Sequence, residues 1–138
     1  KSPGGESIRH MAEQEAAHLR DFDAMVNARR VRPTALQPLW HLAGFALGAG
    51  TALMGERAAM ACTVAVEEAI DEHYAKQAKY LGEDESELRD LIVAAREDEI
   101  EHRNTALEAG AERAPLFEPM RHAIKSGTKL AIWLSERV

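Results

Sequence analysis

The segments EQEAAH (residues 13–18) and EDEIEH (residues 97–102) each place a glutamate three residues before a histidine, as Glu15/His18 and Glu99/His102. Residues three apart share one face of an α-helix, so each pair can bring a carboxylate and an imidazole to the same metal ion. This mixture of ligands favours iron or manganese over calcium, which prefers oxygen alone. Two such pairs also arise by chance in a short glutamate-rich chain, so the rest of the sequence must decide.

The hydrophobic periodicity predicts five helices and no strand. The expected ranges are about 6–30, 36–54, 57–81, 85–109 and 115–138. Gly82 and Gly110 are the expected glycine stops of the third and fourth helices. Because the connections are short, we expect an all-α bundle that forms a single domain over residues 1–138.

The composition narrows the functional classes. Hydrophobic residues make up 46% of the 138 residues, which excludes a disordered chain, and the net charge is −6. No basic stripe with interleaved aromatic residues is present, so nucleic-acid binding is not expected. The single Cys62 excludes a disulfide framework and is expected to be a small buried residue.

Glu67 is a candidate fifth metal ligand. It lies in the apolar run CTVAVEEAI (62–70), where an unpaired carboxylate is costly. It precedes Leu81 by as many residues as Glu99 follows Glu85, so two antiparallel helices joined near residue 82 place Glu67 opposite Glu99. Glu68 is turned by about 100° from Glu67 and should point elsewhere. The alternative is that Glu67 is a surface carboxylate of an amphipathic helix.

The order of these residues matches the ligand set of di-iron carboxylate bundles. Such bundles take one glutamate from each of two helices and Glu-x-x-His from each of the other two. Five of the six ligands are present, as Glu15, His18, Glu67, Glu99 and His102. The height argument places the sixth on a helix upstream of Lys1, so we expect an N-terminally shortened chain. An incomplete ligand set would leave such a chain inactive on its own.

The segment LWHLAGFALGAGTALMG (39–55) is apolar nearly all round. It is short and rich in glycine for a transmembrane helix, which needs about 20 apolar residues. Two interpretations remain open. The helix is either buried in the core, or it lies against a partner or a membrane surface, where Arg29, Arg30 and Arg32 would add attraction to anionic headgroups.

Several longer segments resemble the demethoxyubiquinone hydroxylase family, the di-iron monooxygenases of ubiquinone biosynthesis. They are EQEAAHL (13–19), VRPTALQPLWHLAGFALGAGTALMG (31–55), AMACTVAVEEAIDEHY (59–74), EDEIEH (97–102) and KLAIWLSERV (129–138). The resemblance implies a ferritin-like bundle, with the metal ligands at the five positions named above. Trp133 stands where the family commonly has a tyrosine, so a role for that hydroxyl is not expected.

The resemblance also implies a reaction and its partners. Two iron ions would activate O₂, and one oxygen atom would enter the ring of a polyprenylated methoxy-methyl-benzoquinol. The reducing equivalents would come from NADH or from the quinol itself. The expected location is peripheral, on the cytoplasmic face of a bacterial inner membrane or the matrix side of the mitochondrial one. A homo-oligomer, or assembly with other proteins of ubiquinone biosynthesis, is also implied.

The same residues are compatible with two other functions. The first alternative is a ferritin-like iron-binding or oxidase protein without hydroxylase activity, and the second is an interaction module that binds no metal. A substrate-sized apolar channel would favour the hydroxylase. His73 and Tyr74 lie six and seven residues beyond Glu67, about two helical turns, and are candidates for a proton or electron path, although such residues are commonly surface or supporting groups.

Overall fold

The computed structural model describes residues 3–138. It contains the α-helices α1 (Pro3–Ala28), α2 (Gln37–Leu53), α3 (Glu56–Tyr80), α4 (Ser86–Glu108) and α5 (Phe117–Ser135). Short 3-10 turns, η1 (Glu83–Glu85) and η2 (Ala111–Arg113), precede α4 and α5. The described residues form no strand. The all-α prediction is therefore confirmed, and the predicted helix boundaries are within a few residues of those observed.

The two glycine stops behave differently. Gly110 follows α4 with φ 93° and ψ 27°, the left-handed conformation expected of a glycine at this position. Gly82 has φ −84° and an extended ψ, so the predicted left-handed stop after α3 is wrong. A Cβ on Gly82 would lie 2.9 Å from Oδ1 of Asp84, but this atom is the end of a flexible side chain that can turn away.

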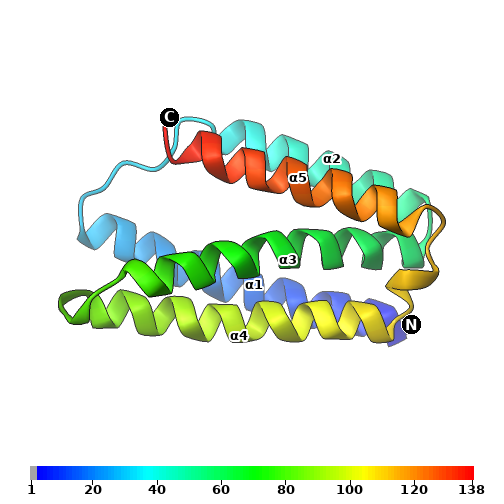
Figure 1. Ribbon diagram of the computed structural model, residues 1–138, viewed down its shortest axis with the longest axis horizontal. Helices are drawn as coiled ribbons and strands as arrows, with labels where there is room; N and C mark the ends of the chain where they lie inside the picture. Colours follow the sequence, from blue (N-terminus) through cyan, green and yellow to red (C-terminus); the bar gives the residue numbers. More distant parts are fainter. Residues whose placement is uncertain (1–2) are drawn as a thin grey trace.

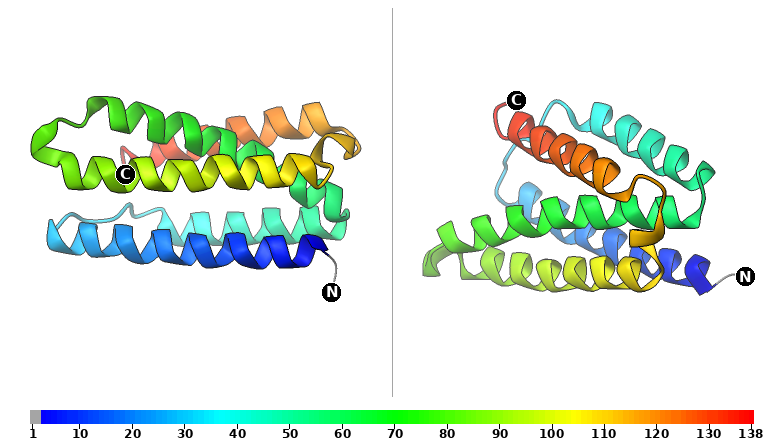
Figure 2. Two further views of the ribbon diagram at one scale, coloured as in Figure 1. Left: turned by 90° about the horizontal axis from the view of Figure 1, so that it is seen from below. Right: turned by 45° about the vertical axis from the view of Figure 1, so that its right-hand side comes forward.

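Helix α3 is the centre of the bundle. Figure 1 shows it between two layers, with α2 and α5 on one side and α1 and α4 on the other, and the right-hand view of Figure 2 shows the same order. Small residues allow α3, α4 and η2 to approach one another closely. Their buried cluster consists of Met60, Ala61, Val64, Ala106, Ala111 and Ala114.

Helix α5 is held along α3 by a series of ion pairs. Arg121 Nη2 lies 3.0 Å from Glu68 Oε2, and Lys125 and Lys129 contact the two oxygens of Glu72 at 2.6 and 2.8 Å. These lysines lower the pKa of Glu72 to about 2. Glu68 therefore faces α5, and the adjacent Glu67 is left to face α4, as the angle of about 100° between successive residues requires.

Helix α2 is mostly exposed. Thr51 is its one buried residue, whereas Leu42 is 67% exposed, Phe45 75% and Leu53 90%. The interpretation of α2 as a buried core helix is therefore wrong for the described chain, and the interfacial interpretation remains. No described helix has both the length and the hydropathy needed to cross a membrane.

Candidate metal centre

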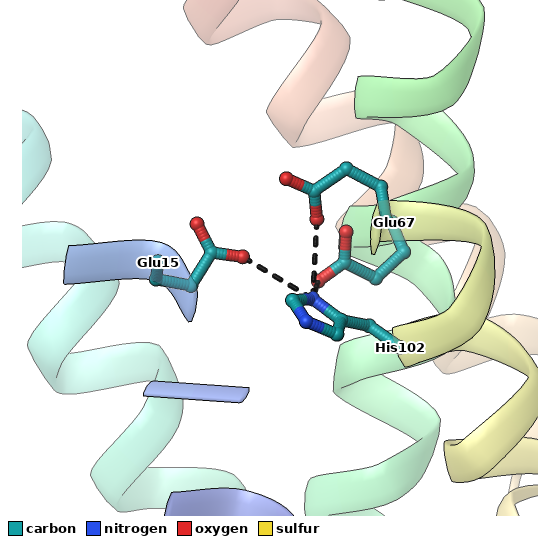
Figure 3. A group of neighbouring side chains, drawn as sticks. Glu15, Glu67 and His102 are labelled. Carbon is teal, nitrogen blue, oxygen red and sulfur yellow. Dashed lines mark ion pairs between the residues drawn. The ribbon is translucent and has the colours of Figure 1, made fainter. Parts of the chain in front are cut away.

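His102 on α4 lies at the meeting point of three helices. Its Nδ1 is 3.4 Å from Oε1 of Glu15 on α1, 3.5 Å from Oε1 of Glu67 on α3, and 3.3 Å from Oε2 of Glu99 on its own helix. Figure 3 shows the carboxylates of Glu15 and Glu67 converging on the His102 ring. One ligand atom from each of these four residues lies within 4.8 Å of all the others, so the cluster could hold a metal ion.

His18 on α1 forms a second half of the same cluster. Its Nδ1 lies 3.3 Å from Oε1 of Glu99 and 3.7 Å from Oε2 of Glu15. Glu15 and Glu99 therefore each direct one oxygen to His18 and the other to His102. Carboxylates shared between two imidazoles in this way are suited to bridging two metal ions.

The buried ligand atoms are unsatisfied by the protein itself. Nδ1 of both histidines, both oxygens of Glu99 and Oε2 of Glu67 are buried and have no hydrogen-bond partner. Buried polar atoms are seldom left in this state unless they serve a bound group. The donor set and its unsatisfied atoms therefore fit a site for metal ions with nitrogen and oxygen ligands. Iron ligation by these residues remains a prediction.

The electrostatics of the cluster agree with a cation-binding site. Burial tends to lower the pKa of His102, but the carboxylates of Glu15, Glu67 and Glu99 outweigh it and raise that pKa to about 11. Burial raises the pKa of Glu99 to about 6, with a smaller contribution from Glu67. The carboxylates thus favour positive charge at their centre, and the buried cluster tolerates a further negative charge poorly.

Polar residues hold the outer sides of both histidine rings. His18 Nε2 lies 2.8 Å from Oδ2 of Asp98, and His102 Nε2 lies 2.8 Å from Oε1 of Gln14. Asp98 and Gln14 lie outside the set of site residues predicted from the sequence. The available signal was their position, because each directly precedes the glutamate of a Glu-x-x-His pair and so lies four residues before its histidine.

The two candidate path residues are placed differently from each other. Tyr74 stacks on Phe22 of α1, with ring centroids 6.1 Å apart. Burial raises its pKa above the usual range, and so do the carboxylates of the cluster. His73 instead contacts Glu136, with Nδ1 3.9 Å from Oε1, and burial lowers the pKa of His73. The structure thus brings Tyr74 toward the cluster and turns His73 toward the end of α5.

The remaining histidines and tryptophans stay outside the cluster. His122 contacts Glu118 on the exposed side of α5, at 3.7 Å. Trp40 donates a 2.7 Å hydrogen bond from Nε1 to Oγ of Ser135, which connects the start of α2 to the end of α5. Beside it, an apolar groove of about 570 Å³ opens between α2, α3 and α5, lined by residues that include Trp40, Leu47, Val66, Ile124 and Ala131.

A helical bundle with carboxylate–histidine pairs on two helices and a further glutamate on a third has the architecture of ferritin-like proteins. The family model described as "Ubiquinone biosynthesis protein COQ7" matches residues 1–135. The chain belongs to this family.

Curated relatives support the assignment. The chain is 59% identical to the 3-demethoxyubiquinol 3-hydroxylase of Rhodospirillum rubrum over 131 residues, which cover 95% of this chain and 62% of the relative. It is 47% identical to the human mitochondrial NADPH-dependent 3-demethoxyubiquinone 3-hydroxylase over 138 residues, covering 97% of this chain and 64% of the relative. The mitochondrial 5-demethoxyubiquinone hydroxylase of Saccharomyces cerevisiae is 37% identical over 146 residues, covering 95% and 63%. The chain thus spans a little under two thirds of the length of these relatives.

Proposed function

We propose that this chain carries the metal centre of a hydroxylase that acts on the ring of a polyprenylated methoxy-methyl-benzoquinol in ubiquinone biosynthesis. The observation that carries the proposal is the cluster of Glu15, His18, Glu67, Glu99 and His102. All of these residues except the exposed Glu15 are buried, and each buried one has an inward atom without a hydrogen-bond partner in the protein. The printed names of the relatives describe hydroxylases of demethoxyubiquinone or its quinol.

The proposed reaction consumes O₂ and two reducing equivalents. One oxygen atom replaces a ring hydrogen as a hydroxyl group, and the other leaves as water with two protons. Two iron ions bound by the cluster would supply the activation of O₂. We propose a nicotinamide nucleotide or the quinol as the reductant, and the name of the human relative specifies NADPH.

The protein residues have defined tasks in this proposal. Glu15 and Glu99 would hold metal together with both histidines, because each carboxylate directs one oxygen to His18 and the other to His102. Glu67 and His102 would hold metal at one end of the cluster, and His18 would hold metal at the other end. Tyr74, stacked on Phe22, lies near enough to the cluster for its carboxylates to raise the pKa of the phenol.

We further propose that α2 meets the membrane in which a polyprenyl substrate resides. Exposed Leu39, Leu42 and Phe45 give α2 an apolar surface of the kind that binds a partner or a lipid phase. Of the three arginines expected to assist, Arg29 is already paired with Glu85 at 2.6 Å and Arg32 donates to the backbone of Val138. Their contribution to membrane binding should therefore be smaller than three free cations would give.

The test is a single-turnover reaction of the intact, iron-loaded protein with a demethoxyubiquinol analogue, a reductant and ¹⁸O₂. Incorporation of one ¹⁸O atom into the ring, detected by mass spectrometry, is the expected result. Consumption of O₂ with oxidation of the iron but no labelled ring product would instead support the ferritin-like oxidase. Failure to bind iron would exclude both.

A further inference from the structure

The outer nitrogens of the two histidines are supported across the α1–α4 contact in a reciprocal manner. Asp98, four residues before His102 on α4, accepts from His18 on α1. Gln14, four residues before His18 on α1, contacts His102 on α4. The two supports also contact each other, since Gln14 Nε2 donates to Asp98 Oδ1 at 3.4 Å. One continuous chain, His18–Asp98–Gln14–His102, therefore joins the two rings.

The chemistry of the groups fixes the direction of every hydrogen bond in this chain. A carboxylate can only accept, so the amide NH₂ of Gln14 must face Asp98 and its carbonyl oxygen must face His102. His102 must then donate from Nε2, and His18 must donate from Nε2 to the other oxygen of Asp98. In the neutral rings both Nδ1 atoms consequently hold a lone pair directed toward the carboxylate cluster.

We propose that Asp98 and Gln14 are positioning residues that together set both histidines in the form that binds metal through Nδ1. The inference rests on the metal centre of the proposed function and adds a shared support to it. Asp98 acts on His18 directly and on His102 through the orientation of the Gln14 amide. A change at this one carboxylate is therefore felt at both ends of the cluster.

The arrangement makes Asp98→Asn unusually informative. An asparagine amide presents one acceptor and one donor, whereas His18 and Gln14 both donate to this residue. If the asparagine oxygen faces His18, the asparagine NH₂ faces Gln14. The Gln14 amide must then turn its oxygen toward the asparagine and its NH₂ toward Nε2 of His102. That Nε2 becomes an acceptor, so the neutral His102 ring carries its proton on Nδ1. If the asparagine oxygen faces Gln14 instead, the asparagine NH₂ faces Nε2 of His18, and the neutral His18 ring carries its proton on Nδ1. Either way, one Nδ1 is protonated and no longer available to a metal ion.

A double substitution restores the pattern by exchanging the two groups. In Asp98→Asn with Gln14→Glu, the asparagine oxygen accepts from His18 and its NH₂ donates to Glu at position 14. That carboxylate also accepts from His102 Nε2, so every donor again meets an acceptor. The net charge equals that of the original protein. Only residues acting through this chain of hydrogen bonds should show such a rescue.

A variant of Gln14 that tests the hydrogen bond must not let a water molecule replace the amide oxygen beside His102. Gln14 and His102 line the inner end of a cleft of about 280 Å³ between α1 and α4. A small side chain at position 14 would let water from this cleft take the place of the amide oxygen. Gln14→Met retains the length of the side chain and removes the acceptor, and it is the better single variant.

The experiment measures Zn²⁺ binding by the intact protein and identifies the ligating nitrogens by long-range ¹H–¹⁵N NMR of the histidine rings. The original protein should bind through both Nδ1 atoms with both Nε2–H groups visible. Asp98→Asn should weaken binding about 10- to 100-fold and alter one ring, and Gln14→Met should alter His102 alone. Glu97→Gln, an exposed neighbour on α4, is the matched control and should bind as the original does. Circular dichroism of the metal-free variants establishes that each one is folded.

Three outcomes separate the hypotheses. If the original protein binds no Zn²⁺, the proposed metal centre fails. If it binds Zn²⁺ but both single variants retain its affinity and ring signals, the positioning role is overturned while the metal centre stands. The same holds if the double variant binds no better than Asp98→Asn. Recovery of affinity and of both Nε2–H signals in the double variant supports the proposal.

Discussion

Glu99→Gln should have opposite effects on stability and on metal binding. Glu99 is 1% exposed, and burial raises its pKa from the ordinary value of 4.5 to about 6 even beside the imidazole of His102. A raised carboxylate pKa means that ionisation is harder in the folded state than in the unfolded state. Above pH 6 the charge on Glu99 therefore destabilises the metal-free protein, and a neutral glutamine removes this cost.

The size of the effect follows from the shift. At about 1.4 kcal/mol per pKa unit, a rise from 4.5 to about 6 corresponds to roughly 1–2 kcal/mol. For a chain of this length, that is an increase in Tm of roughly 3–6 °C. The amide can also be accommodated, because its oxygen can accept from His102 and its NH₂ can donate to Nδ1 of His18.

Metal binding should change in the other direction. Each oxygen of Glu99 faces a different histidine, so its replacement weakens both halves of the cluster, by roughly 100-fold or more in affinity. The assay pairs thermal unfolding of EDTA-treated protein at pH 7 with iron content after anaerobic loading. Glu101→Gln is the control, because Glu101 is exposed on another face of α4. A less stable metal-free Glu99→Gln protein, or one that retains its iron as the control does, would refute the reasoning.

Three further predictions concern protons, lipid and the core. Because the carboxylates raise the pKa of His102 to about 11, metal binding at pH 7 should release about one proton from this residue, and the metal affinity should rise about tenfold per pH unit. Calorimetry in buffers of different ionisation enthalpy measures the number of protons released, and a value of zero would contradict the prediction. Phe45→Glu should reduce flotation with anionic liposomes relative to Gln37→Glu on the same helix, and equal flotation would exclude α2 as the contact. Met60→Ala, at a side chain 1% exposed, should lower the free energy of unfolding by about 2–5 kcal/mol in urea titration, and a loss below 1 kcal/mol would show that the core relaxes to fill the cavity.

The helices and the position of Glu67 were predictable because they depend on local rules. Periodicity defines the helical ranges, and a short connection fixes the relative height of two antiparallel helices. The observed connection between α3 and α4 is short, and Glu67 and Glu99 indeed approach the same nitrogen of His102. The prediction for Gly82 failed because the chain leaves α3 in extended backbone with a negative φ, a conformation that does not require glycine.

The exposure of α2 and the supports of the histidines were not predictable in the same way. A helix that is apolar on all sides reads identically whether it is buried or interfacial, so only its neighbours decide. Asp98 and Gln14 depend on which turn of α1 meets which turn of α4, although these turns are 84 residues apart in the sequence. No local pattern in the sequence fixes that register. Once the structure places α1 beside α4, the four-residue spacing explains why the residue four positions before the histidine of each helix contacts the histidine of the other.

The cluster illustrates why a binding site opposes the stability of its own fold. Glu67, Glu99 and His102 are each less than 10% exposed, and they are held with unsatisfied atoms facing one another. A proton on His102 offsets part of the negative charge, but that proton occupies the nitrogen that a metal ion needs. Two divalent cations would neutralise the carboxylates and satisfy the same atoms without it. The hydrogen bonds through Asp98 and Gln14 hold Nε2 of each histidine whether its Nδ1 carries a proton or binds a metal ion. A metal ion can therefore replace the proton without a turn of either ring.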